Sequence, residues 1–332
     1  MSEPFLEVVI CTYNHAPLLD RVLDALAVQH EADASWAVLV VDNNCTDATP
    51  TIVERHIASG TVPGLRRIVE TEQGLTPARR RGVFATSVPW IAFVDDDCLL
   101  AEDWIAQAVA FLRAHPNIGG MGGRVVLEWE DEPPGYVFGY KGMLAEQDRG
   151  DEPTTVESLA GAGMVIRREA LHDSGWLDRP LLDDRIGERL VSGGDVELTL
   201  RVRAAGYPLW YNPACTLRHV IGHDRTSRRY LTRLNYGLGM SDTLVSALVW
   251  EDDYASWRDA TRQKLRRRSG EVVRQVGRAV RRRRALTSAL FDASFVSGRY
   301  AGLRHVERMP RVERERLIGC ASPAVEEVTD HV

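Results

Sequence analysis

Several features that define other classes of protein are missing from this 332-residue sequence. Its five cysteines are scattered and never form a CxxC pair, so we expect reduced, mostly buried thiols rather than a disulfide framework or a zinc site. No apolar run approaches the roughly 18 residues that a membrane-spanning helix needs. The N-terminal MSEPFLEVVI lacks the basic region of a secretory signal. These absences predict a cytoplasmic protein.

Two signatures of nucleotide-binding proteins are also missing. No GxGxxG follows the first apolar run, which disfavours a dinucleotide-binding domain. No GxxxxGK[ST] occurs anywhere, so a P-loop is excluded. Any nucleotide must therefore be bound by other means.

Charge is distributed unevenly along the chain. The net charge is −6, but residues 262–284 hold eleven Lys and Arg against one Glu, a net +10, which leaves −16 for the rest. Valines recur among these arginines at helical spacing, as in a basic amphipathic helix. Such a helix suits an anionic membrane surface, and it equally suits packing on the protein with a solvated basic face. Nucleic-acid binding ranks last, because the segment lacks interleaved aromatic residues.

The first half alternates short apolar runs with helical patterns. Strands are expected over 5–11, 36–42, 65–71 and 89–95, and helices over 16–29, from about 47, over 77–86 and over 102–114. This alternation predicts an α/β fold with a mostly parallel, nucleotide-binding sheet flanked by helices. The near-continuous apolar strands indicate that both faces of the sheet are covered.

The second half is less regular. A glycine-rich strand is expected over 118–129, a long loop over 130–153, a helix from near Asp195 and a short strand at PLWYNPA. From about residue 226 onward the pattern is helical. We therefore divide the chain into residues 1–225, with halves 1–117 and 118–225, and a helical C-terminal region, 226–332.

Polar residues follow the predicted strands where each one ends. They are Thr12-Tyr13-Asn14, Asp42-Asn43-Asn44 and Asp95-Asp96-Asp97, and the third strand leads to Gly74–Arg79. Ligands of open α/β sheets bind beyond the carboxyl ends of the strands, so we expect these groups to share one site. Asp95 and Asp97 lie two apart and suit Mg²⁺ or Mn²⁺. Spacing alone leaves open a solvated turn that caps the next helix.

An ordered set of motifs gives this arrangement a known counterpart. The segments are VVICTYNHAPLLDRVLDAL, VLVVDNNCTDAT, TEQGLTPARRRGV and PWIAFVDDDC, followed by GAGMVIRREAL, GWLD and GGDVELTLRVRAAGY. Over roughly residues 5–225 the chain resembles an inverting family 2 glycosyltransferase with the type-A (GT-A) fold.

The resemblance implies roles for most of the polar residues. Asp95 and Asp97 match the DXD motif, with Asp95 near the ribose and Asp97 on the metal. Thr12, Tyr13, Asn14 and Asp96 would line the nucleotide pocket, Asp42 would pair with the base, and Arg79 would lie near the base or diphosphate. Asp42 could instead only form an Asx turn, and Arg80 or Arg81 could replace Arg79.

The resemblance also assigns a catalytic base. Asp195 matches the position of the carboxylate that deprotonates the acceptor hydroxyl. Gly194 stands where an acidic residue is usual, which leaves open whether Glu197 shares the work. Asp195 could also simply cap its helix.

His219 is the preferred candidate to complete the metal shell, with a structural histidine as the alternative. Arg225, Arg228 and Arg229 could brace phosphates or face solvent.

Acceptor recognition is expected from residues 129–153 and 175–191. Trp129, Tyr136, Tyr140 and Trp176 could stack on sugar rings, and core packing is the alternative for each.

The functional hypothesis is a metal-dependent transfer of sugar from a nucleotide diphosphate, with UDP preferred. The acceptor hydroxyl would belong to a glycan, a lipid-linked saccharide or a small molecule. The rivals are a sugar nucleotidyltransferase, and a degenerate GT-A domain that binds a membrane surface or nucleic acid. The helical region also leaves a homodimer open.

Overall fold

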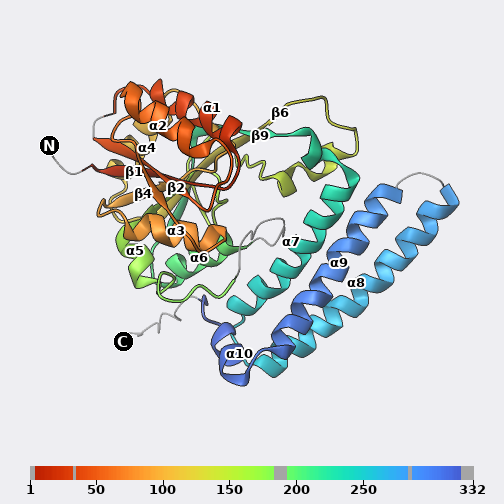
Figure 1. Cartoon of the computed structure of the whole chain (residues 1–332). Coiled ribbons are helices and arrows are strands. Elements are labelled where there is room, and N and C mark those ends of the chain that lie inside the picture. The colour runs from red at the N-terminus through yellow and green to blue at the C-terminus, as the bar shows by residue number, and fades with distance from the viewer. Residues whose placement is uncertain (1–3, 33–34, 183–192, 283–285, 323–332) are drawn as a thin grey trace, which may run out of the picture.

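The computed structural model describes residues 4–32, 35–182, 193–282 and 286–322 (Figure 1). Its N-terminal part is built around four parallel strands in the order β3-β2-β1-β4. Their bounds are β1 Leu6–Thr12, β2 Trp36–Asp42, β3 Arg66–Val69 and β4 Trp90–Phe93. β1 and β2 are almost wholly buried, as expected for apolar strands covered on both faces.

The second part turns the sheet from parallel to mixed. Its strands are β5 Cys98–Leu100, β6 Gly120–Trp129, β7 Thr154–Val156, β8 Met164–Arg167 and β9 Leu209–Ile221. β8 is antiparallel to β4 and β6, β6 is parallel to β9, and β5 and β7 are antiparallel to β9. Over the part of the chain that the structure describes, the result is one nine-stranded sheet.

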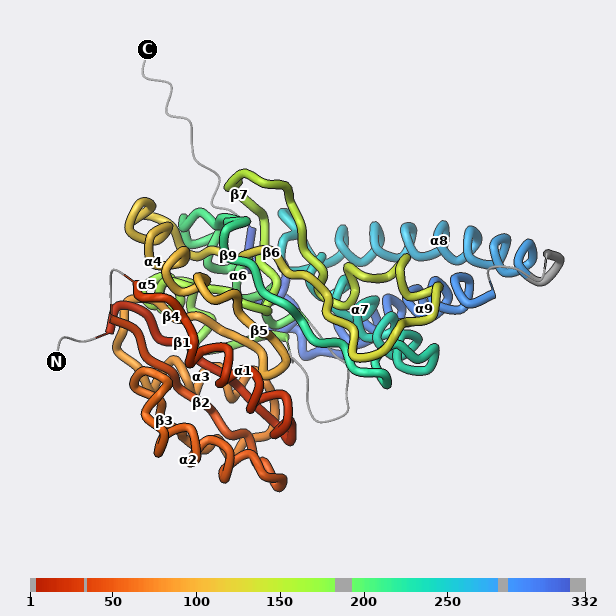
Figure 2. Tube along the Cα trace, turned by 90° about the horizontal axis from the view of Figure 1, so that it is seen from above, coloured from red at the N-terminus to blue at the C-terminus, as the bar shows by residue number. Residues whose placement is uncertain are grey.

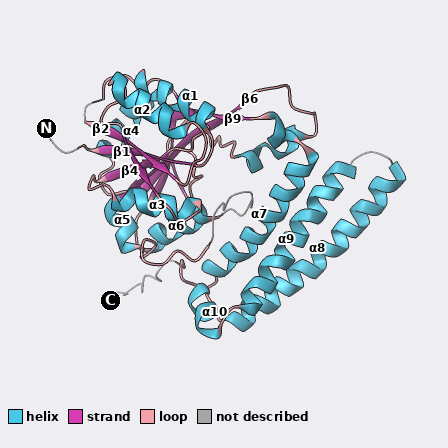
Figure 3. Cartoon of the chain, viewed as in Figure 1, coloured by secondary structure: helices cyan, strands magenta, loops and turns pink. Residues whose placement is uncertain are grey.

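Helices cover both faces of this sheet, so the expected α/β class with a flanked sheet is confirmed (Figure 3). α1 Ala16–Ala27, α2 Thr49–Ser59 and α4 Trp104–Ala114 pack on one face. α3 Leu75–Phe84, α5 Arg168–Asp173 and α6 Gly194–Ala204 pack on the other. Each layer has its own apolar cluster against the sheet.

The C-terminal region is helical, as expected, in the part that the structure describes. It contains α7 Arg228–Leu248, α8 Tyr254–Arg282, α9 Leu286–Arg308 and α10 Arg311–Leu317. α9 packs on both α7 and α8, and the α8–α9 pair extends away from the sheet (Figure 2). Within the described residues no helix is long and apolar enough to cross a membrane.

Glycines allow α7 and α9 to approach closely. A Cβ at Gly239 would clash with the carbonyl oxygen of Phe295, and one at Gly298 would clash with that of Tyr236. Only glycine leaves room for backbone at this distance. The contact fixes α9 against α7, and α7 in turn borders the sheet domain.

Two local expectations were wrong. The expected loop over 130–153 contains a 3₁₀ segment, η1 Val137–Leu144, and the expected short strand at PLWYNPA is the beginning of the longer β9. β9 reaches Ile221 because it pairs with β5, β6 and β7. These tertiary contacts lengthen the strand, and the sequence of β9 alone does not indicate them.

Candidate active site

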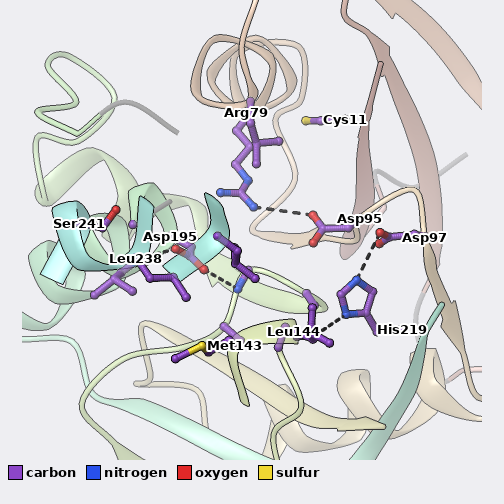
Figure 4. Close-up of a pocket in the computed structure, with 18 of the residues that line it drawn as sticks. Cys11, Arg79, Asp95, Asp97, Met143, Leu144, Asp195, His219, Leu238 and Ser241 are labelled. Carbon is purple, nitrogen blue, oxygen red and sulfur yellow. Dashed lines mark hydrogen bonds and ion pairs between the residues drawn. The ribbon is translucent and has the colours of Figure 1, made fainter. Parts of the chain in front are cut away.

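A cavity of about 890 Å³ lies beyond the carboxyl ends of β1 and β4. The sheet domain supplies one side of it, through Thr12, Arg79 and the aspartate triplet. η1, α6, α7 and α9 supply the other side. Figure 4 shows Asp195 between the groups of the sheet domain and those of α7.

Asp97 and His219 form a buried pair in this cavity. The turn between β4 and β5 carries Asp97, and β9 carries His219, whose Nε2 lies 3.2 Å from Asp97 Oδ2. His219 Nδ1 lies 2.8 Å from the carbonyl oxygen of Leu144. A carbonyl can only accept, so Nδ1 carries a proton and donates to Leu144, and Nε2 is the ring nitrogen directed at Asp97.

Arg225 completes this cluster. Its Nη1 donates to Asp97 Oδ2 at 2.6 Å and lies 3.2 Å from His219 Nε2. Burial opposes the charge, but the carboxylate of Asp97 outweighs it, and the pKa of Arg225 is raised. The negative charge of Asp97 is therefore matched by a cation inside the protein.

The donor atoms of this cluster fit a divalent ion. A carboxylate oxygen and an imidazole nitrogen converge on one point, a combination that suits Mn²⁺ and accommodates Mg²⁺ through its oxygen. Cys98 lies close to both; burial raises the pKa of its thiol, and sulfur is a softer donor than Mg²⁺ or Mn²⁺ prefers.

Arg79 and Asp95 lie next to this cluster. Arg79 Nη2 is 3.8 Å from Asp95 Oδ1, and its guanidinium stacks over the Phe93 ring at 5.6 Å. Arg80 instead donates to the Leu177 carbonyl, and Arg81 is exposed. Of the three arginines, Arg79 is the one that lines the cavity.

Asp195 faces the cavity from the first turn of α6. Its Oδ2 accepts from the Gly161 amide and its Oδ1 from the Val196 amide, each at 2.9 Å. The residue that caps α6 is Gly193, whose φ of 119° suits glycine, so the alternative in which Asp195 is the N-cap is wrong. Gly161 allows this arrangement, because a Cβ there would lie 2.7 Å from Arg79 Nη2 and 3.2 Å from Asp195 Oδ2.

Glu197 lies outside the cavity. It is fully buried and accepts hydrogen bonds from the amides of Leu181 and Leu182 and from Arg201. Burial raises the pKa of Glu197 against these stabilising contacts. Glu197 therefore has a structural role, because its hydrogen bonds join α6 to residues 181–182. Of the expected acceptor segment 175–191, residues 183–191 lie outside the described residues.

The ends of the first two strands contribute unequally. Thr12, Tyr13 and Asn14 line the cavity, and the buried Thr12 hydroxyl has no hydrogen-bond partner among the described residues. Asp42 is not part of the cavity wall: it accepts from Arg67 and from the Cys45 amide, each at 2.9 Å. Asp42 therefore forms the Asx turn that the sequence left open as the alternative to pairing with the base.

Asn43, beside Asp42, lines the cavity instead and accepts from the Gly74 amide at 2.8 Å.

His15 is a further wall residue that the motif analysis missed. Its Nδ1 lies 2.9 Å from Asp96 Oδ1, and this hydrogen bond is the main reason that the pKa of His15 is raised. The sequence offered a signal for His15, since it directly follows the strand-end group Thr12-Tyr13-Asn14, whereas Asn43 already belongs to the strand-end group Asp42-Asn43-Asn44.

The expected acceptor aromatics lie elsewhere. Tyr136 and Tyr140 pack edge-on against Phe291 of α9, at centroid distances of 6.2 and 4.9 Å. Trp129 packs against Phe138, and Trp176 is buried in the core. None of these four expected aromatics is among the cavity-lining residues. The tyrosines anchor η1 to α9, and η1 presents Met143 and Leu144 to the cavity.

Comparisons with known proteins agree with this geometry. The family model described as glycosyl transferase family 2 matches residues 7–175, just over half of the chain. The glycosyltransferase AglE of Haloferax volcanii is 29% identical over 210 residues, which is 63% of this chain and 64% of that protein. The chain thus spans less than two thirds of that relative's length. An uncharacterized glycosyltransferase of Mycobacterium tuberculosis is 30% identical over 222 residues, 62% of this chain and 83% of the relative.

A solved structure shares the fold. It is the mannosyltransferase PcManGT of Pyrobaculum calidifontis in complex with GDP-Man and Mn²⁺, with a TM-score of 0.59 and 19% sequence identity. The match covers 91% of this chain and 88% of that one. Together with the family match over most of the sheet domain, this shows that the chain belongs to glycosyl transferase family 2 and has the GT-A fold.

Proposed function

We propose that this protein is a metal-dependent inverting glycosyltransferase. It moves a sugar from a nucleotide-diphosphate donor to an acceptor hydroxyl. One observation carries the proposal: a carboxylate, Asp195, faces the same cavity as the Asp97–His219 pair and the Arg79 guanidinium. The reaction needs a base on one side of the sugar and a counter-charge for the diphosphate on the other.

The donor side of the proposed site consists of the strand ends of the sheet domain. Thr12, Tyr13 and Asn14 would line the nucleotide subsite, and the buried Thr12 hydroxyl has no hydrogen-bond partner among the described residues. Asp95 lies between this subsite and Asp97. A Mg²⁺ or Mn²⁺ ion held by Asp97 and His219, with Asp95 beside them, would offset the charge that develops on the leaving diphosphate. Arg79 adds a fixed positive charge on the same side.

Asp195 is the proposed base. The Gly161 amide fixes its Oδ2, which sets the direction from which the carboxylate meets the acceptor hydroxyl. As that oxygen attacks the anomeric carbon, Asp195 accepts its proton while the bond to the diphosphate breaks on the opposite face. Attack opposite the leaving group inverts the configuration. Gly194 leaves this step without an adjoining carboxylate, and buried Glu197 does not replace it.

UDP is the preferred nucleotide, and GDP is the main competitor, because PcManGT, which shares the fold, was solved with GDP-Man. The first test is thermal stability in UDP, GDP, dTDP or CDP, each with and without Mn²⁺ or Mg²⁺. A nucleotide at 100 times its Kd should add about 2.7 kcal/mol of stability. Stabilisation that needs both one nucleotide and a metal supports the donor assignment.

The second test is the variant Asp195→Asn. It should keep metal-dependent nucleotide binding and lose transfer by at least a hundredfold. The matched control is Asp151→Asn, because the Asp151 side chain is 92% exposed and is not among the cavity-lining residues. Transfer by Asp195→Asn at the wild-type rate would refute the base assignment. Release of pyrophosphate from a nucleoside triphosphate and a sugar 1-phosphate, with no release of nucleoside diphosphate from the nucleotide sugar, would identify a nucleotidyltransferase instead.

A further inference from the structure

We propose that the acceptor carries a hydrocarbon or aromatic group next to the hydroxyl that receives the sugar. This inference rests on the proposed function and adds the chemical class of the acceptor. It is drawn from an apolar wall of the cavity, which consists of Met143, Leu144, Leu234, Leu238, Val245 and Phe295.

The apolar wall comes from three elements that meet at the cavity. Met143 and Leu144 end η1, the next three residues lie on α7, and Phe295 lies on α9. Leu144 and Leu234 are buried in the cluster that joins η1 to these helices, and Met143 and Leu238 pack against it. Because η1 is anchored on α9 and α9 is locked to α7 through Gly239 and Gly298, the wall is a preformed surface.

The cavity is therefore divided by chemistry, with Asp195 at the boundary. One side suits a diphosphate and the metal ion that would accompany it. It consists of Arg79, Asp95, Asp97, His219 and Arg225. On the other side, Leu238 lies beside Asp195 in Figure 4. The base thus stands where a polar donor and an apolar acceptor would meet. α7 adds two polar groups to the cavity wall, Ser241 and Asp242, and Asp242 is paired with Arg299 at 2.7 Å.

A purely saccharide acceptor fits this surface poorly. Sugar rings need hydrogen-bond partners around their hydroxyls and aromatic faces for stacking. The aromatics expected for that task pack elsewhere. An alkyl or aryl group beside the reacting hydroxyl instead covers apolar surface that would otherwise face water.

The test compares two small probes that differ only in the apolar group. Octyl β-D-glucopyranoside, below the concentration at which it forms micelles, and methyl β-D-glucopyranoside are each mixed with the full chain, nucleotide and Mn²⁺. Saturation-transfer NMR reports which protons contact the protein. We expect saturation of the octyl chain and at least tenfold weaker binding of the methyl glycoside. In Leu238→Asp the octyl signal should be lost.

Two controls keep this result interpretable. Leu290→Asp places the same change on α9, where the side chain is 48% exposed, and should leave the octyl signal unchanged. Leu238→Gln is a milder change in case the aspartate variant does not fold. Equal binding of both glycosides, or an octyl signal that survives Leu238→Asp and Leu238→Gln, overturns the apolar acceptor. The metal-dependent stabilisation by nucleotide is measured on the same samples: if it persists, the proposed function stands, and if it is absent, the acceptor proposal falls with it.

A second proposal rests on a different observation, the outer face of α8. We propose that this face binds the surface of an anionic lipid bilayer. α8 buries Trp257, Leu265 and Ala279 and turns Arg266, Arg267, Arg274 and Arg278 outward. Figure 2 shows that the α8–α9 hairpin extends away from the sheet domain, so this basic face is accessible. These exposed arginines belong to residues 262–284, a segment of net charge +10, whereas the rest of the chain sums to −16.

Exposed apolar side chains favour lipid over nucleic acid. Val273, between these arginines, is 70% exposed, and Leu286 and Leu290 near the same end of the hairpin are 51% and 48% exposed. Apolar side chains that enter the headgroup region of a bilayer strengthen binding to the membrane, whereas a nucleic-acid phosphate backbone is bound through positive charge and not through apolar groups. Arginine and apolar side chains on one exposed end therefore match an anionic membrane surface.

The experiment is sedimentation of the full chain with phosphatidylcholine vesicles that contain or lack phosphatidylglycerol. We expect binding only with phosphatidylglycerol, weakened by salt, and at least tenfold weaker binding after the double change Arg266→Glu and Arg274→Glu. The matched control is Arg218→Glu with Arg311→Glu, two exposed arginines outside the hairpin. No binding to the anionic vesicles, equal losses in both double variants, or tighter binding to single-stranded RNA than to vesicles would overturn the proposal.

Discussion

Gly161→Ala tests the geometry of the site with one added methyl group. The new Cβ would lie 2.7 Å from Arg79 Nη2, closer than real Cβ contacts, and 3.2 Å from Asp195 Oδ2. The amide of residue 161 remains, so its hydrogen bond to Asp195 is not removed; both side chains are displaced instead. Arg79 can move the end of its side chain, so the free energy of unfolding should fall by less than about 1 kcal/mol.

The effect on transfer should be larger than the effect on stability. A shift of a few tenths of an ångström in both the proposed base and the diphosphate-side cation should lower kcat/KM by roughly ten- to a hundredfold. The assay is release of nucleoside diphosphate at saturating metal, with Tm measured on the same sample. The matched control is Gly139→Ala, since a Cβ there meets nothing within 4 Å. Wild-type turnover by Gly161→Ala would refute the claim that Asp195 and Arg79 act from these positions.

Three further predictions concern charge and packing. Arg225→Gln removes a cation 2.6 Å from Asp97 and should tighten Mn²⁺ binding without nucleotide by about tenfold in calorimetry; weaker binding would contradict competition between the two cations. Burial raises the pKa of Asp20, but hydrogen bonds from His56 and Arg55 outweigh it and lower the pKa below 3.8. Because the pKa of Asp20 is lower in the folded state, its carboxylate stabilises the fold at pH values above 3.8. Asp20→Asn should therefore lower the free energy of unfolding in urea by roughly 1.5–3 kcal/mol at pH 7. This difference should shrink as the pH falls below 3.8. Gly298→Ala, which drives a Cβ into the Tyr236 carbonyl, should cost about 2–4 kcal/mol, whereas Gly277→Ala in open space on α8 should be neutral or gain up to about 1 kcal/mol; equal Tm values for the two would contradict the close contact of α7 and α9.

The sheet domain was largely predictable because its strands carry local signals. WAVLVVD is apolar up to its final aspartate, and the structure places β2 over those same residues. β5 was missed because Cys98–Leu100 follows the aspartate triplet directly and is only three residues long. Short strands of this kind are defined by their partner, here β9, rather than by their own composition.

The strand-end side of the cavity was predictable for the same reason. Strand ends of a parallel sheet meet at one edge, so Thr12, Asn14, Asp95 and Asp97 converge as expected. Asp42 does not line the cavity, because its carboxylate accepts a hydrogen bond from Arg67 on the neighbouring strand.

The acceptor side was not predictable from local pattern. Leu238 and Phe295 read as ordinary core positions of long helices, and nothing in their spacing says that α7 and α9 face Asp195. The tyrosines of η1 illustrate the converse error. As aromatic residues in an expected loop they suggested sugar stacking, but they pack against Phe291, which lies far along the chain.

The pairing of Asp97 with His219 and Arg225 has a consequence for how the chain is made. These partners lie 122 and 128 residues downstream of the aspartate. On the ribosome Asp97 emerges long before His219 and Arg225, and loop closure over that distance must precede the contact. The parallel strands can form first, with Arg79 near Asp95 and His15 on Asp96, but Asp97 then still lacks the partners that hold it in the finished fold. The cavity acquires its final electrostatic balance only when β9 and the turn after it have been synthesised, so the donor side depends on the second half of the chain.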